Sequence, residues 1–238
     1  MNTTKLQSQI LAALLVVSAA SSAALPSFAA TASVSSAITA PSSQVVTRDK
    51  ALTDQVMQLL DAKQYDEAMN VVTQAINGNS KNAVAYLLKA IVLYVEQQPT
   101  EAVIEQINIA ISIAPNYADA LYSRASIYES VKDYQNALKD YAAVVAIDST
   151  NIDAVNACAG LSYELKDWNG MLTYVNMLIQ NKPDDGNLYY ERAYANIMLG
   201  QKDAAIADLQ QAQKFFIASN QTDKAKDCGD AIAQLENA

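Results

Sequence analysis

The stretch that decides the fold is residues 118–151, which read ADALYSRASIYESVKDYQNALKDYAAVVAIDSTN. Small residues recur along the chain at the place that Ala125 takes in this stretch. The steps of this series are 34, 35, 34 and 34 residues, and its members are Val56, Ala90, Ala125, Ala159 and Ala193. A fixed period of this length is typical of stacked helical repeats. The chain is therefore predicted to repeat one structural unit five times.

A second series keeps the same four steps twelve residues further along, and its members are Ala68, Ala102, Ala137, Met171 and Ala205. Small residues at this separation suit two helices joined by a tight turn, because the backbones must approach closely. Each unit is thus predicted to be a helical hairpin. The predicted units span 49–82, 83–117, 118–151, 152–185 and 186–219. The extra residue of the second unit is predicted to lie between Ala102 and Ala110.

Residues 118–151 resemble the tetratricopeptide repeat family, which places large, small and aromatic residues in a fixed order. The residues that carry the resemblance are Leu121, Ala125, Tyr128, Tyr134 and Ala137. Tyr65 and Trp168 take the place of Tyr134 in two other units, whereas Pro99 and Lys202 depart from the pattern there. The resemblance implies an all-α fold, a right-handed helical-hairpin solenoid of about five tetratricopeptide repeats.

Residues 220–238 follow the last repeat and are predicted to form a C-terminal capping helix. The apolar residues at helical spacing in this segment are Ala225, Cys228, Ala231, Ile232 and Leu235. An open stack of helices ends in an apolar face, and a last helix with a polar outer side shields that face from water. Two helices from each repeat and one cap make eleven predicted helices.

The composition excludes several classes of function. The 238 residues include no His, and 16 Lys and Arg stand against 25 Asp and Glu, a net charge of −9. The absence of His removes the commonest general base and the commonest zinc ligand. The acidic balance argues against nucleic acid as a partner. The protein is therefore expected to have no catalytic residues, no metal and no cofactor.

Residues 1–29 have the features of a cleaved signal peptide. Lys5 precedes an apolar run from Ile10 to Ala20, which is eleven residues long and so too short to span a bilayer. Residues 30–48 are rich in Ser, Thr and Ala and are predicted to form a disordered linker. The mature protein is therefore expected to be exported to the bacterial cell envelope, periplasmic or secreted, without direct membrane insertion.

Three pairs of opposite charges are separated by sixteen residues, namely Arg124 with Asp140, Arg192 with Asp208, and Lys89 with Glu105. The resemblance places the members of each pair on facing helices of one hairpin, so an ion pair is expected in each. Recurrence at one structural place favours a packing role over a catalytic relay.

Cys158 and Cys228 are predicted to be small core residues. They lie on helices separated by a whole repeat, and the Cα atoms of a disulfide must come within about 7 Å of each other. A disulfide between them is therefore not expected.

Tyrosine is the unusual feature of the composition, because 13 Tyr stand beside 3 Phe and 1 Trp. Several Tyr fall at the first-helix positions that face the concave groove in the resembled family. The predicted partner-binding groove consists of Leu87, Ile91, Tyr94, Asp119, Tyr122, Glu129, Asn156, Tyr163, Glu164, Tyr190 and Tyr194. Since this surface is aromatic and acidic, a basic or neutral peptide or protein is the expected partner.

The predicted function is that of a non-catalytic scaffold or adaptor for protein–protein interaction in the cell envelope. One alternative is a structural module that self-associates into a homo-oligomer. A remote alternative is an envelope glycan hydrolase that uses Glu129 and Glu164 as its carboxylate pair.

Overall fold

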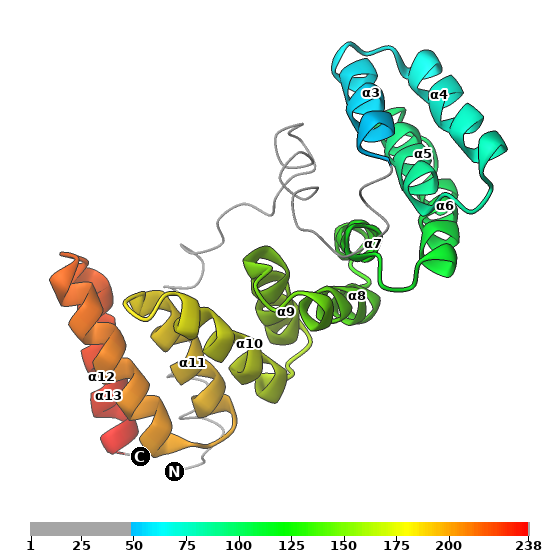
Figure 1. Ribbon diagram of the computed structural model, residues 1–238. Helices are drawn as coiled ribbons and strands as arrows, with labels where there is room; N and C mark the ends of the chain where they lie inside the picture. Colours follow the sequence, from blue (N-terminus) through cyan, green and yellow to red (C-terminus); the bar gives the residue numbers. More distant parts are fainter. Residues whose placement is uncertain (1–48, 238) are drawn as a thin grey trace. The chain divides into compact units, whose positions relative to one another are not determined.

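The computed structural model describes residues 49–237, and this part of the chain contains eleven α-helices and no strand (Figure 1). The helices are α3 (Lys50–Asp61), α4 (Tyr65–Gly78), α5 (Ala83–Val95), α6 (Thr100–Ile113), α7 (Ala118–Ser130), α8 (Tyr134–Ile147), α9 (Ile152–Glu164), α10 (Trp168–Asn181), α11 (Gly186–Met198), α12 (Lys202–Ala218) and α13 (Thr222–Glu236). The all-α fold class and the predicted number of helices are confirmed. The predicted signal peptide, 1–29, and linker, 30–48, lie outside the described residues.

Each predicted repeat range contains two helices, and α13 lies in the range of the predicted cap. Asparagine side chains cap the N-termini of α5 and α9, each of which is the first helix of its hairpin. The Oδ1 atom of Asn82 accepts a hydrogen bond from the backbone N–H of Ala85, and Asn151 does the same for Ala154, both at 3.0 Å. These caps satisfy amides that have no partner within their own helix.

The turn inside every hairpin places one residue in the left-handed region of backbone space. These residues are Lys63, Gln97, Lys132, Lys166 and Gly200, with φ between 58° and 73°. The following amide bonds back to the carbonyl five residues earlier, as Asp133 does to Tyr128 at 2.8 Å. This bond is typical of a Schellman motif, which ends a helix and reverses the chain. Asn220 makes the same turn between α12 and α13.

The extra residue of the second repeat lies in this turn and not in the second helix. α6 begins three residues after Gln97, whereas the second helix of each other hairpin begins two residues after the equivalent residue. Pro99 is the added residue and directly precedes α6. As a result Val103, which is 2% exposed, takes the buried place that Ala68 takes in the first repeat. The predicted place after Ala102 is therefore wrong.

The described residues divide into two compact units, 49–154 and 155–237, and the boundary lies inside α9. Val56, Val72 and Ile107 are almost completely buried in the core of the first unit. Leu209 and Phe216 have the same role in the second unit. Each unit therefore buries an apolar core between its own helical hairpins.

Candidate functional site

The predicted groove residues are divided between the two units. Those of unit 49–154 lie on α5 and α7 and are Leu87, Ile91, Tyr94, Asp119, Tyr122 and Glu129. Those of unit 155–237 lie on α9 and α11 and are Asn156, Tyr163, Glu164, Tyr190 and Tyr194. The structure brings together only part of each set.

An apolar hollow lies between α5, α6 and α7 in the first unit. It is shallow, and its walls are Leu87, Ala90, Ile91, Tyr94, Val103, Ile107, Ser123 and Ile127. Five of these residues, Leu87, Ala90, Val103, Ile107 and Ile127, are at most 5% exposed. Three of these residues, Leu87, Ile91 and Tyr94, were predicted as groove residues from the sequence. Because most of the walls are buried, the hollow offers a partner only a small apolar surface, to which Tyr94 contributes at 39% exposure.

Tyrosine and carboxylate side chains lie together on the other side of α7. The Tyr141 hydroxyl donates a hydrogen bond to Oε2 of Glu129 at 3.1 Å. The rings of Tyr122 and Tyr141 meet edge to face, with centroids 5.0 Å apart. Burial and the charges of Asp153 and Glu129 raise the pKa of Tyr122. Tyr122 therefore lies in the field of two carboxylates, one of which is held in place by Tyr141.

Asp119 lies one turn before this group on α7. Its backbone carbonyl accepts a hydrogen bond from the Ser123 hydroxyl at 2.7 Å. Burial raises the pKa of the Asp119 carboxyl to about 6. The carboxyl is therefore mostly ionised at neutral pH and adds to the negative charge of this part of α7.

In the second unit Tyr163 and Tyr194 pack with Trp168 in a cluster of three rings. The centroids are 6.0 Å apart for Tyr163 and Trp168, 5.4 Å for Tyr163 and Tyr194, and 5.7 Å for Trp168 and Tyr194. Tilted contacts of this kind stabilise aromatic pairs beyond the area that they bury. Asn156 and Glu164 are exposed on α9. The tyrosines of this unit thus serve packing more than the formation of an open surface.

Tyr190 is a core residue, and the prediction that it lies in an open groove is wrong. Its side chain is 7% exposed and belongs to the same apolar cluster as Phe216 and Cys228. Its hydroxyl is buried and has no hydrogen-bond partner among the described residues. The physical reason is the cap, because α13 packs at the end of the stack where Tyr190 would otherwise face a partner.

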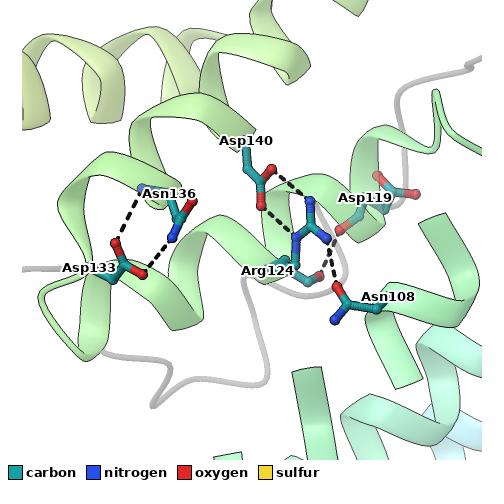
Figure 2. Close-up of polar contacts among 7 residues, drawn as sticks. Asn108, Asp119, Arg124, Asp133, Asn136 and Asp140 are labelled. Atoms are coloured by element: carbon teal, nitrogen blue, oxygen red, sulfur yellow. Dashed lines mark hydrogen bonds and ion pairs between the residues drawn. The ribbon is translucent and has the colours of Figure 1, made fainter. Parts of the chain in front are cut away.

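Two of the three predicted ion pairs are formed, and each joins neighbouring hairpins as well. Arg124 donates from Nε and Nη2 to Asp140 at 2.7 and 2.9 Å and from Nη1 to Asn108 at 2.6 Å (Figure 2). Arg192 bonds in the same way to Asp208 and, at 2.6 Å, to Asn176. Each arginine therefore links the second helix of the preceding hairpin to that of its own.

The predicted pair of Lys89 with Glu105 is not among the ion pairs of residues 49–237. The residue added at Pro99 shifts α6 by one position, so Gln106 stands where Asp140 stands in the next hairpin. One position on a helix is a rotation of about 100°. Glu105 is accordingly exposed.

Sequence reasoning missed the asparagines Asn108 and Asn176, although a signal was present. Each lies sixteen residues before its arginine, the same separation that joins each arginine to its aspartate. Two equal steps of sixteen residues around an arginine could have identified both side chains as its partners.

Cys158 and Cys228 are free and buried, which confirms the prediction of core cysteines without a disulfide. Burial raises the pKa of the Cys158 thiol to about 12, and a hydrogen bond with Tyr174 acts in the opposite direction. Cys158 and Tyr174 take the places of the arginine and the aspartate in the fourth hairpin.

No group of side chains in the described part of the chain could hold a metal ion. None of its helices is long and apolar enough to cross a membrane.

The carboxylates of the hydrolase alternative differ in their surroundings. Glu129 belongs to unit 49–154 and accepts the hydrogen bond of Tyr141, whereas Glu164 belongs to unit 155–237 and is exposed. Neither observation gives the pair a catalytic arrangement.

A model of the tetratricopeptide repeat family matches residues 118–151 and 186–215. This chain contains tetratricopeptide repeats. The two matched tetratricopeptide repeats are those that hold the pairs of Arg124 with Asp140 and of Arg192 with Asp208. Each pair joins the two helices of one matched repeat.

Known proteins resemble these tetratricopeptide repeats over part of their length. RNA polymerase II-associated protein 3 of Xenopus tropicalis is 33% identical over 104 residues, which are 43% of this chain and 16% of that protein. This chain therefore corresponds to a small part of that relative.

Solved structures share the fold at low identity. A chain in the structure of Naa15/Naa10 bound to HypK-THB has a TM-score of 0.63 and 16% identity, over 79% of this chain and 33% of that chain. The crystal structure of MamA has a TM-score of 0.55 and 15% identity, over 72% of this chain and 93% of that chain. The likeness shows the helical-hairpin fold.

Proposed function

We propose that this protein is a non-catalytic scaffold that binds a protein or peptide on the first-helix face of unit 49–154. The observation that carries the proposal is the partly buried Tyr122 on α7, which packs against Tyr141 and lies in the field of Glu129 and Asp153. Buried apolar area supplies affinity at such a surface, and fixed charges select the partner.

The fold and the comparisons support binding rather than catalysis. Tetratricopeptide repeats form stacked hairpins that present an extended surface, as repeat proteins of this kind do. The similar chain in the Naa15/Naa10 structure is part of an assembly with HypK-THB. Assembly with other proteins is thus a property of a protein with the same fold.

The charge of this chain favours a basic or neutral partner. The net charge is −9, and α7 places Asp119 and Glu129 beside Tyr122. A partner segment with Lys or Arg gains attraction and faster association at such a surface, and an acidic segment is repelled.

The proposal includes export to the cell envelope. Its support is the amino-acid sequence of residues 1–29, in which Lys5, the apolar run and the small residues at Ser27 and Ala29 follow the order of a cleaved signal. N-terminal sequencing of the protein from cells tests this part. A mature chain that begins near Ala30 supports export, and an intact N-terminus in the cytoplasm contradicts it.

Partner binding is tested by crosslinking the full mature chain in the native envelope fraction. We expect one crosslinked heterologous partner whose yield falls in the variants Tyr122→Ala and Glu129→Gln. Glu105→Gln is the matched control, because Glu105 is exposed on α6 away from the hollow. Crosslinks between copies of this chain alone, unchanged by the variants, would contradict the proposal and favour the self-associating module.

A further inference from the structure

Two asparagines of the chain directly precede a glycine, Asn77 before Gly78 and Asn169 before Gly170. Asparagine is a chemically labile residue, and it loses its side-chain amide most readily before glycine, because glycine has no Cβ to shield its backbone nitrogen. Both asparagines are exposed. Both pairs lie in helices, and the two helices hold them in different ways.

Loss of the amide requires the backbone nitrogen of the glycine to reach Cγ of the asparagine. The nitrogen forms a bond to Cγ, the bond between Cγ and Nδ2 breaks, and ammonia leaves with the proton of the glycine amide. Water then opens the cyclic succinimide at either carbonyl, which yields aspartate or isoaspartate. The peptide unit must rotate out of the helical conformation for this attack, so the reaction rate depends on how firmly the helix holds that unit.

The peptide unit between Asn169 and Gly170 is held by side chains at both ends. Its N–H donates to Oδ1 of Asp167 at 3.0 Å, and its carbonyl accepts a hydrogen bond from the Thr173 hydroxyl at 3.0 Å. The unit lies in the first turn of α10, so its rotation displaces the residues that follow, including the fully buried Val175. Opening at this point therefore disrupts the packing of α10.

The peptide unit between Asn77 and Gly78 is the last one inside α4. The Asn77 carbonyl belongs to the last turn, whose carbonyls no amide of the same helix reaches. The amide of Lys81, which would continue the helical pattern, donates instead to Oδ1 of Asn79 at 3.0 Å. Rotation of the unit breaks only the last bonds of the helix, among them that of the Asn79 amide to the Ala75 carbonyl at 3.0 Å. No buried side chain of α4 follows it.

We propose that Asn77 is a site of spontaneous deamidation in the folded protein, and that α10 protects Asn169 from the same reaction. Helix ends open at little cost in free energy, whereas opening inside a packed helix approaches the cost of global unfolding. The two asparagines have the same reactive neighbour, and the fold makes the difference between them.

Deamidation at Asn77 changes the junction between the first two hairpins. The new carboxylate lies in the last turn of α4, where the helix dipole disfavours negative charge. Isoaspartate also lengthens the backbone of the turn that leads to Asn82, whose Oδ1 caps α5 by accepting a hydrogen bond from the amide of Ala85 at 3.0 Å. The modified chain is therefore expected to hold the end of α4 less firmly.

The test is peptide mapping of the full chain by mass spectrometry after incubation in mildly alkaline buffer, with and without urea. It measures the fraction of each asparagine that is converted to aspartate and isoaspartate over time. In urea we expect the two asparagines to react at rates within about threefold of each other, because each precedes Gly. In the folded chain we expect Asn77 to react at least about tenfold faster than Asn169.

Two variants assign the cause of the difference. Gly78→Ala fits the structure, because nothing lies within 4 Å of the added Cβ, and it is expected to slow the reaction of Asn77 at least about tenfold. Asp167→Ala frees the amide of Gly170 and is expected to speed the reaction of Asn169 about three- to tenfold, with no change at Asn77.

A smaller difference between the two asparagines of the folded chain, or a faster reaction at Asn169, would overturn the proposal. Loss of both amides in urea alone would overturn it as well, because it would show that the end of α4 stays closed in the folded protein.

Discussion

Replacing Asp140 by Ala is expected to lower the stability of unit 49–154 by about 3 kcal/mol. The carboxylate accepts two hydrogen bonds from Arg124, at 2.7 and 2.9 Å, and its side chain is 5% exposed. Removing one partner of a buried pair costs about 3–5 kcal/mol because the other charge is left without compensation. Arg124 is 20% exposed and keeps its bond to Asn108, which places the loss at the lower end of this range.

The free energy of unfolding of the full chain in urea, followed by circular dichroism, measures this loss. A change of about 3 kcal/mol moves the unfolding midpoint of the unit by roughly 1–2 M urea. Glu105→Ala is the control, since Glu105 is exposed and has no ion pair among the described residues, and it is expected to change stability by less than about 0.5 kcal/mol. Equal effects of the two variants would refute the assigned role of the pair.

Three further predictions concern the turns and the second unit. Lys166 and Gly200 both have φ above 55°, where glycine is favoured over other residues. Lys166→Gly is therefore expected to raise the free energy of unfolding by about 0.5–1 kcal/mol, and Gly200→Ala to lower it by about 1 kcal/mol. Urea unfolding of each variant measures the direction of the change. Tyr190→Phe is expected to leave thermal stability unchanged or to raise it by up to about 1 kcal/mol, because the lost hydroxyl is buried without a partner; a clear loss would show that the hydroxyl is bonded. Burial raises the pKa of Cys158 and Cys228 to about 12, so both thiols are neutral at pH 8. Iodoacetamide is therefore expected to alkylate them at least about a hundredfold more slowly in the folded chain than in the urea-unfolded chain. Similar alkylation rates in both states would contradict their burial.

The helical hairpins could be predicted because two independent series kept the same period. Residues such as Val56 and Ala193 are buried where the series placed them. The added residue was misplaced because Ala102 and Val103 are neighbours and both are small enough for a close helix contact. Only the turn distinguishes them, and Gln97 carries no sequence signal for its left-handed backbone. The error of one residue then produced the wrong pairing of Glu105.

The sequence predicted which helices carry the candidate site, but not how deeply each of its side chains is buried. On α5, Ile91 is only partly buried, whereas Leu87 is 5% exposed and belongs to the core. At the end of the stack the spacing of the groove residues failed for Tyr190, because α13 covers it. The face of a single helix follows from its own sequence, but what lies against that face depends on residues far along the chain.

Stability and the proposed binding surface meet on α7, since this helix carries Arg124 as well as Tyr122 and Glu129. Arg124 holds α7 to α6 through Asn108 and to α8 through Asp140. The same two helices supply the floor of the hollow, with Val103 and Ile107, and the hydroxyl of Tyr141 that orients Glu129. A change in how α7 is held therefore alters the position of the Glu129 carboxylate, although Asp140 itself is buried and bonded to Arg124. Asp140→Ala should lower partner crosslinking together with the stability of the unit, whereas Glu129→Gln should lower crosslinking and change stability by less than about 0.5 kcal/mol. This difference separates support of the site from recognition by it.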